Sequence, residues 1–180
     1  MESERWGGAV DTVGGETLAG LIRTMGQGCA VAACGLLCRT DWFLRIPWKT
    51  STFRRADVSS SLPLAKISGA YVTSVLARRE ATLEGFDEAI LLDPHGFVCQ
   101  GAGENVFLVK NGELHTPELG GGGLDGITRQ TIIQFAKDLG IPVIERRITR
   151  DEFYIAEEAF FTGTAAEVTP IREYDDRPIG

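Results

Sequence analysis

The stretch Ala-Phe-Phe-Thr-Gly-Thr-Ala-Ala-Glu-Val-Thr-Pro-Ile, residues 159–171, is the most specific motif of this chain. Its two ends, residues 159–162 and 168–171, are rich in apolar and β-branched side chains and predict two strands. The small residues 163–166 between them predict a tight bend. Such a bend offers backbone amides and a hydroxyl to an anion, although a plain tight turn has the same composition. The stretch therefore predicts a strand pair with a candidate anion site at its tip.

Towards the N-terminus, the sequence predicts helices and strands in mixed order. Apolar residues recur at helical spacing over residues 61–85, and Gly85 sits where that helix would end. Two turn sequences, Asp93-Pro94-His95-Gly96 and Asn111-Gly112, predict hairpins. The predicted elements are helix 61–85, strands 89–92, 97–99, 106–109 and 113–115, helix 126–139, strand 143–147, a short helix opened by the capping box 149–152, and strands 159–162 and 168–171. This order predicts an α+β lobe with a sheet curved around a central site.

The composition excludes several classes of protein. The chain has 180 residues, of which 43% are hydrophobic and 24% charged, with a formal net charge of -7 and a pI near 4.9. We expect so acidic a chain to bind neither nucleic acid nor an anionic membrane. The longest apolar stretch, residues 29–38, is too short to span a membrane, and residues 1–5 lack the basic character of a secretory signal. We therefore expect a soluble, cytoplasmic protein.

The chain changes character about a quarter of the way along. Residues 1–46 hold eight glycines, three of the four cysteines and two of the three tryptophans, without a sustained helical or strand period. We expect this segment to be poorly ordered and residues 47–180 to form the folded lobe. Metal binding by Cys29, Cys34 and Cys38 is an alternative, but their spacing is irregular for zinc and no fourth ligand lies near. We therefore expect no metal site.

Lys66 is the first candidate for chemistry. It follows Pro63 at the start of the predicted helix 61–85, where a lysine on the inward face would be costly to keep charged. Burial lowers the pKa of an amine and makes it a candidate for a Schiff base with a carbonyl group. The alternative is an exposed helix lysine, which is the commoner case for a lysine taken alone.

Two glycine-containing loops are further candidates. Gly101–Asn105 follows a predicted strand, and its glycines allow the backbone to approach a flat ligand. Leu124–Arg129 leads into a helix N-terminus, where free amides, the helix dipole and the Thr128 hydroxyl predict a phosphate site. The alternatives are a bulged strand connection for the first loop and a flexible loop before a capped helix for the second.

Five motifs of the chain occur in the order seen in branched-chain amino-acid aminotransferases. They are Lys66-Ile-Ser-Gly-Ala-Tyr71 and residues 101–105, 126–129, 147–152 and 161–171. From about Lys49 onward, the chain resembles the cofactor-binding C-terminal lobe of these enzymes, which are fold-type IV pyridoxal-phosphate enzymes. The resemblance implies a D-amino-acid-aminotransferase-like α+β lobe with a curved, barrel-like sheet and flanking helices. It also implies pyridoxal 5′-phosphate as the cofactor.

The resemblance gives roles to individual residues. Lys66 would carry the cofactor and act as the catalytic base and acid, and Tyr71 would hydrogen-bond its phenolic oxygen. The phosphate would be held by the amides of Leu124 and Ile127 and by the hydroxyls of Thr128 and Thr164. The substrate carboxylate would reach Thr164 and the Ala165 amide, and Glu104 would support the site without touching the cofactor.

The chain departs from the family pattern at three places. Gln100 stands where the family has a glutamate facing the pyridine nitrogen, and glutamine cannot supply the negative charge that stabilises a pyridinium. Asp125 brings a negative charge close to the phosphate loop. The family's N-terminal lobe, which supplies a phosphate-binding arginine and part of the side-chain pocket, is not recognisable in residues 1–46, so we expect a chain that lacks it.

The resemblance implies transamination between leucine, isoleucine or valine and 2-oxoglutarate, in a homodimer or a multiple of it. Relatives within the fold, a D-amino-acid aminotransferase or an aminodeoxychorismate lyase, are alternatives that an amino-donor screen would separate. A further alternative is a truncated, non-catalytic remnant of such an enzyme. The expected partners are therefore amino acids and 2-oxo acids.

Overall fold

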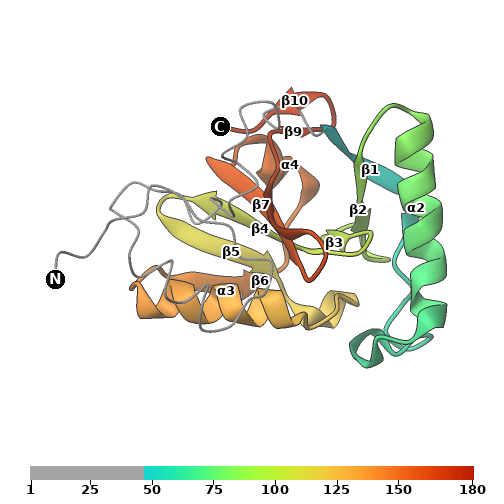
Figure 1. The fold of residues 1–180 in the computed structure, drawn as a ribbon, viewed down its shortest axis with the longest axis horizontal. Coiled ribbons are helices and arrows are strands. Elements are labelled where there is room, and N and C mark those ends of the chain that lie inside the picture. The colour runs from blue at the N-terminus through green and yellow to red at the C-terminus, as the bar shows by residue number, and fades with distance from the viewer. Residues whose placement is uncertain (1–46) are drawn as a thin grey trace, which may run out of the picture.

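A computed structural model describes residues 47–180 of the chain. Figure 1 shows two sheets, with helix α2 (Val72–Leu83) beside the first and helix α3 (Ile127–Asp138) along the second. This arrangement confirms the α+β fold that the sequence predicted. No helix in the described part is long and apolar enough to cross a membrane. The expectations for residues 1–46, including the cysteines, lie outside the described residues.

The first sheet has the strand order β10-β9-β1-β2-β3. Its strands are β1 (Pro47–Arg54), β2 (Glu88–Leu92), β3 (Val98–Gly101), β9 (Glu173–Tyr174) and β10 (Arg177–Pro178). Strand β1 is parallel to both β2 and β9. Parallel strands need a long crossover, and α2 supplies it between β1 and β2. Strands β2 and β3 form the first predicted hairpin.

The second sheet has the strand order β6-β5-β4-β7-β8. Its strands are β4 (Asn105–Lys110), β5 (Glu113–Pro117), β6 (Val143–Arg146), β7 (Glu158–Gly163) and β8 (Glu167–Pro170). The predicted β4–β5 hairpin turns at Asn111 and Gly112, which both have positive φ, as the favoured two-residue turn requires. Helix α4 (Arg150–Tyr154) starts at the predicted capping box, where the Thr149 amide donates to the Glu152 carboxylate.

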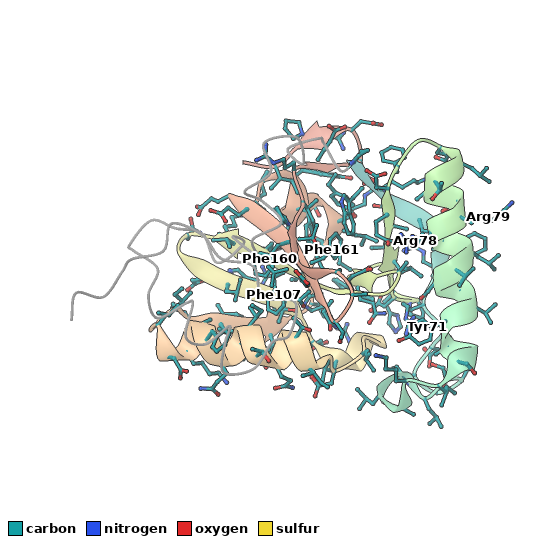
Figure 2. The ribbon with its side chains drawn as sticks, viewed as in Figure 1. Tyr71, Arg78, Arg79, Phe107, Phe160 and Phe161 are labelled. Carbon is teal, nitrogen blue, oxygen red and sulfur yellow. The ribbon has the colours of Figure 1, made fainter. Side chains whose placement is uncertain are left out.

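The main core lies between the two sheets. Trp48 of β1 stacks on Phe161 of β7, with ring centroids 3.3 Å apart. On the other face of the second sheet, the rings of Phe107 and Phe160 stack with their centroids 5.1 Å apart (Figure 2). Both residues pack in the apolar cluster that the sheet forms with α3. The second sheet is therefore covered on both faces, and this packing fixes the positions of β4 and β7.

The predicted helix 61–85 is wrong in its start and in its buried face. Two single 3₁₀ turns, η2 (Pro63–Ala65) and η3 (Ser68–Tyr71), precede α2. The helix buries small residues against the sheet, while larger apolar ones face outward. The buried residues of α2 are Ser74, Ala77 and Ala81, and its exposed apolar residues are Val72, Val75, Leu76 and Leu83. Leu64 and Ile67, which lie before the helix, are exposed as well. Small side chains allow α2 to lie close to β1 and β2, a preference that apolar spacing alone does not reveal.

Candidate active site

The first turn of α3 is suited to binding an anion. The helix begins at Ile127 after Gly126, and within the described residues no side chain caps its start, so its first amides remain available as donors. These amides and the positive end of the helix dipole favour negative charge. A methyl group at Gly126 would overlap Asn105 Oδ1, so the glycine is needed for the helix to start against β4. The geometry fits the phosphate site predicted here.

Leu124, just before this helix, is held from both sides. Its N–H donates to Gln100 Oε1 at 2.8 Å, and its carbonyl accepts from Asn105 Nδ2 at 2.7 Å. We call these three residues the Leu124 clamp. Gln100 lies in β3 and Asn105 begins β4, so the clamp fixes the loop to both sheets. It also corrects one expectation: the Leu124 amide is bonded to Gln100 and is not free for phosphate, which leaves the amides of Ile127 and Thr128.

Arg55, which no sequence motif indicated, joins this loop to the segment before α2. The residue follows β1 and is 8% exposed. Its guanidinium donates to the carbonyl of Gly122 at 3.2 and 3.3 Å, to that of Ala70 at 3.4 Å and to the Ser74 hydroxyl at 3.2 Å. Ala70 precedes Tyr71, which Figure 2 shows near the N-terminal end of α2. One buried cation thus positions the Tyr71 segment relative to the phosphate loop.

Lys66 lies in the exposed connection between η2 and η3, not on the inward face of a helix, so the burial argument for its reactivity is wrong. Its φ of 49° and ψ of 38° are left-handed. Five non-glycine residues of the described part have positive φ; three are Asn or Asp, which tolerate it, and the others are Lys66 and Glu167. Both lie in motifs of the predicted site. Strained backbone concentrates at functional sites, so the conformation supports a role for Lys66.

The bend between β7 and β8 stands beside the start of α3. Thr162 of β7 pairs with Asn105, the residue that contacts Gly126. Thr164 and Ala165 follow and are exposed, so their polar groups are accessible to a ligand. The Thr162 hydroxyl is buried and has no hydrogen-bond partner among residues 47–180. Buried polar groups are usually paired, so an unpaired one here indicates a place for a polar ligand or a water.

Two largely buried carboxyl groups lie behind the site. The Glu104 carboxylate folds back on its own loop, where it accepts from the Gly103 amide at 3.0 Å and would clash with a side chain at Gly101. Burial raises the pKa of Glu104. Burial, and then the charge of Glu104, raise the pKa of Glu88 to about 7. These contacts direct Glu104 towards its own loop, which agrees with a supporting role.

The Asp125 carboxylate contacts side chains of α3. Its Oδ1 accepts from Gln130 Nε2 at 2.6 Å and lies 3.4 Å from Arg129 Nη1. The buried Arg129 also pairs with Glu145, at 2.6 Å. Pairing with a cation offsets part of the negative charge, so the repulsion that Asp125 would exert on a phosphate is smaller than the sequence suggests.

These groups together fit pyridoxal phosphate, which has a phosphate, an aldehyde and a ring nitrogen to accommodate. The start of α3 and the Thr128 and Thr164 hydroxyls are donors for a phosphate, and the glycine at 126 allows α3 to start against Asn105. Lys66 supplies an amine, and the buried Gln100 supplies an amide in the wall behind. The donor set therefore matches the three polar parts of the cofactor.

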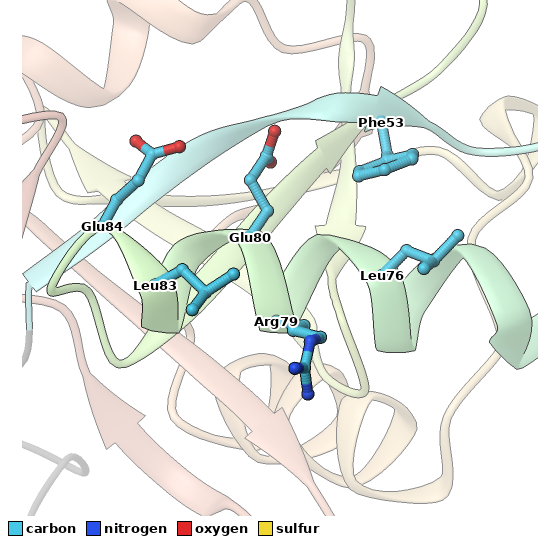
Figure 3. A pocket seen from close by; sticks show the side chains of 6 residues that line it. All are labelled: Phe53, Leu76, Arg79, Glu80, Leu83 and Glu84. Carbon is cyan, nitrogen blue, oxygen red and sulfur yellow. The ribbon is translucent and has the colours of Figure 1, made fainter.

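A separate groove lies between Phe53 of β1 and one side of α2. It has a volume of about 280 Å³ and is formed by Phe53 and by residues of α2 (Figure 3). Its lining residues are Phe53, Leu76, Arg79, Glu80, Leu83 and Glu84. None of them belongs to the predicted site, so this groove is not where the chemistry is expected.

Comparisons with known proteins show which family the chain is similar to. Residues 39–174 match the family model described as amino-transferase class IV. The branched-chain-amino-acid aminotransferase of Pseudomonas aeruginosa is 56% identical over 132 residues, which are 73% of this chain and 43% of that protein. The crystal structure of the branched-chain aminotransferase of Thermoproteus uzoniensis with norvaline has a TM-score of 0.74 and 48% identity, and covers 76% of this chain and 46% of that one.

A third similar protein was solved with its cofactor. The branched-chain amino acid aminotransferase of Thermobaculum terrenum, in its PLP-form, has a TM-score of 0.73 and 39% identity, and covers 76% of this chain and 45% of that one. The chain spans less than half the length of each of these three proteins.

Proposed function

Because the chain belongs to the amino-transferase class IV family, we propose that it is the cofactor-binding part of a branched-chain-amino-acid aminotransferase. The proposed cofactor is pyridoxal 5′-phosphate, and the proposed reaction transfers an amino group from leucine, isoleucine or valine to 2-oxoglutarate. The proposal includes the homodimer, or multiple of it, that the resemblance implies.

One observation carries the proposal: Arg55 and the Leu124 clamp bring three predicted motifs to one centre. Arg55 bonds to Ala70 and Gly122, and so ties the lysine-bearing segment to the phosphate loop. The clamp ties the same loop to Gln100 and Asn105. Figure 1 shows the N-terminal ends of α2 and α3 turned towards the same corner of the molecule. Side chains far apart in the sequence can therefore act on one small ligand.

Binding would use the polar groups at this corner. The Ile127 and Thr128 amides at the start of α3, with the Thr128 and Thr164 hydroxyls, would hold the phosphate. Tyr71 would donate a hydrogen bond to the phenolic oxygen. Thr164 and the Ala165 amide would orient the substrate carboxylate.

Catalysis would use Lys66. When bound, pyridoxal phosphate supplies an electron sink that makes the α-hydrogen of an amino acid acidic. The Lys66 amine would attach the cofactor, leave it when the amino acid arrives, and then remove the proton from the substrate Cα as a general base. The same amine would return this proton on the cofactor side. Its exposed, left-handed position leaves the side chain free to move between these atoms.

A non-catalytic remnant is the second candidate, because the buried Gln100 cannot supply the negative charge that would stabilise a pyridinium. The two candidates differ in turnover, not in where the cofactor would sit. A remnant would bind pyridoxal phosphate without releasing a 2-oxo acid.

An amino-donor screen on the full 180-residue chain tests the proposal. The chain is loaded with pyridoxal phosphate, and its absorption spectrum is followed as single amino acids are added. We expect conversion to the amine form of the cofactor with leucine, isoleucine and valine, in the Lys137→Ala control as in the unchanged chain, and none with Lys66→Ala. Conversion with D-alanine and with none of the branched-chain amino acids would indicate a D-amino-acid aminotransferase instead. A bound cofactor that no donor converts would favour the remnant.

A further inference from the structure

The orientation of the Gln100 side-chain amide is fixed by its partner. Gln100 is 5% exposed, and the atom 2.8 Å from the Leu124 nitrogen is its Oε1. The two ends of a glutamine amide are usually assigned from their partners, and a backbone N–H can only donate. Turning the amide over would place two donors against each other. Leu124 cannot turn away, because Asn105 holds its carbonyl at 2.7 Å.

The other end of this amide is therefore the –NH2 group. It carries two hydrogens and no acceptor site, so it can only donate. Within residues 47–180, the bond to Leu124 is the one hydrogen bond that the Gln100 side chain makes. The –NH2 group is thus left to meet a ligand, and any ring nitrogen that meets it has to offer a lone pair.

The chemistry of the cofactor places its ring nitrogen on this side. In pyridoxal phosphate the nitrogen lies across the ring from the aldehyde, and the phosphate arm lies beside the aldehyde. With the aldehyde at the exposed Lys66 and the phosphate at the start of α3, the nitrogen faces the buried side of the site, where Gln100 lies. Gln100 is a polar residue on this buried side and lies next to Gly123. A Cβ atom at position 123 would be 3.7 Å from Gln100 Oε1.

None of the described charged groups near Gln100 places a free carboxylate where it could stabilise a protonated ring nitrogen. The buried Arg55 cation bonds to Gly122 of the same loop and disfavours a second positive charge. Asp93 lies near Gly121, but its Oδ1 accepts from the amides of His95 and Phe97. The Glu104 carboxylate is turned to Gly103, and the nearby Cys99 is a thiol that donates to the Gly121 carbonyl at 3.2 Å.

We propose that Gln100 contacts the ring nitrogen as a hydrogen-bond donor and keeps that nitrogen unprotonated, so that this site works with a neutral pyridine. The inference rests on the proposed function, because it requires pyridoxal phosphate in this orientation. Gln100 then touches the cofactor and also holds the loop that leads to the phosphate site. Replacing Gln100 by glutamate changes its contact with the ring nitrogen. It preserves the bond to the loop, because either carboxylate oxygen can accept from the Leu124 amide.

The test is the nitrogen NMR spectrum of pyridoxal phosphate labelled with ¹⁵N in its ring and bound to the full chain. The label reports the protonation of the ring nitrogen directly and does not depend on turnover. Absorbance and mass of the borohydride-reduced protein show separately whether the cofactor is attached. The variants are Gln100→Glu and, as a control for added charge, Gln134→Glu on the exposed side of α3.

We expect the signal of a neutral pyridine in the unchanged chain and in Gln134→Glu, from mildly acidic to mildly basic pH. We expect the signal of a pyridinium in Gln100→Glu. A third variant, Gln100→Met, guards against misfolding of the charged one. Its ring nitrogen should stay neutral, and it should bind the cofactor at least about two- to tenfold more weakly, because the bond to the ring nitrogen and the bond that holds Leu124 are both lost. A pyridinium signal in the unchanged chain, or a neutral one in a folded, loaded Gln100→Glu, would overturn the inference and leave the proposed function standing. A chain that attaches no cofactor would overturn both.

Discussion

Replacing Arg55 by methionine tests whether one buried cation organises the site. Methionine keeps most of the apolar stem but removes every donor that reaches Ala70, Ser74 and Gly122. Arg54, the preceding residue, is exposed, so Arg54→Met is a matched control that removes the same charge from the surface.

The expected cost follows from the three groups left without a donor. A buried acceptor that loses its partner costs about 1–3 kcal/mol, so the three together cost roughly 3 kcal/mol or more. Removing a buried guanidinium recovers part of this, because its desolvation is no longer required. We therefore expect Arg55→Met to lower the free energy of unfolding by about 2–4 kcal/mol, and Arg54→Met to change it by less than about 0.5 kcal/mol.

Urea unfolding followed by circular dichroism measures both variants, and titration with pyridoxal phosphate measures the site. A loosened loop should weaken cofactor binding by about tenfold, equivalent to about 1.4 kcal/mol, when the variant is still folded. If Arg55→Met unfolds at the same urea concentration as Arg54→Met and binds the cofactor equally well, Arg55 does not organise the site.

Three further substitutions probe the clamp and the buried carboxyl groups. Gln100→Glu should raise the rate of the amino-donor half-reaction about tenfold or more, equivalent to about 1.4 kcal/mol, at matched cofactor occupancy; an unchanged rate would show that the amide is not limiting. The pKa of Glu88 is raised from 4.5 to about 7, so the folded state binds more protons and stability falls by up to about 3 kcal/mol as the pH rises through that window; Glu88→Gln should flatten this fall in urea unfolding, and an equally steep fall would count against the assignment. Gly126→Ala should displace Asn105 and cost about 1–3 kcal/mol of stability, whereas Gly120→Ala, which meets open space, should match the unchanged chain.

Elements that depend on short-range signals were predicted from the sequence. The turn at Asn111 and Gly112 and the capping box at Thr149 each lie within a few residues of the strands or helix that they define. Helix α3 was bounded correctly to within one residue, because Gly126 and Gly140 flank it. Such signals act through local backbone geometry and need no knowledge of distant contacts.

Elements that depend on distant partners were not predicted. Strand β1 pairs in parallel with β2 across the α2 crossover and with β9 near the other end of the chain. The Thr50 amide and hydroxyl both donate to the Asp175 carboxylate, so β1 is held by residues that no local pattern connects. The same holds for α2, whose start and buried face follow from the sheet it covers.

The sequence indicated candidate residues of the site but not the contacts between them. Gln100 and Leu124 were both expected near the cofactor, but nothing in the sequence indicated that they bond to each other. Arg55 was missed, because its only signal is a second arginine directly after Arg54 at the end of a strand. The assignment of Lys66 rests on the motif around it and on its left-handed backbone, and not on the burial that the sequence suggested.

Borohydride reduction of the loaded 180-residue chain, followed by peptide mapping, shows whether this chain holds pyridoxal phosphate at Lys66. We expect one reduced cofactor per chain, on the peptide that contains Lys66, and none on that peptide in Lys66→Ala. A label on Lys49, Lys110 or Lys137 with Lys66 unmodified, or no label after saturation with the cofactor, would contradict it.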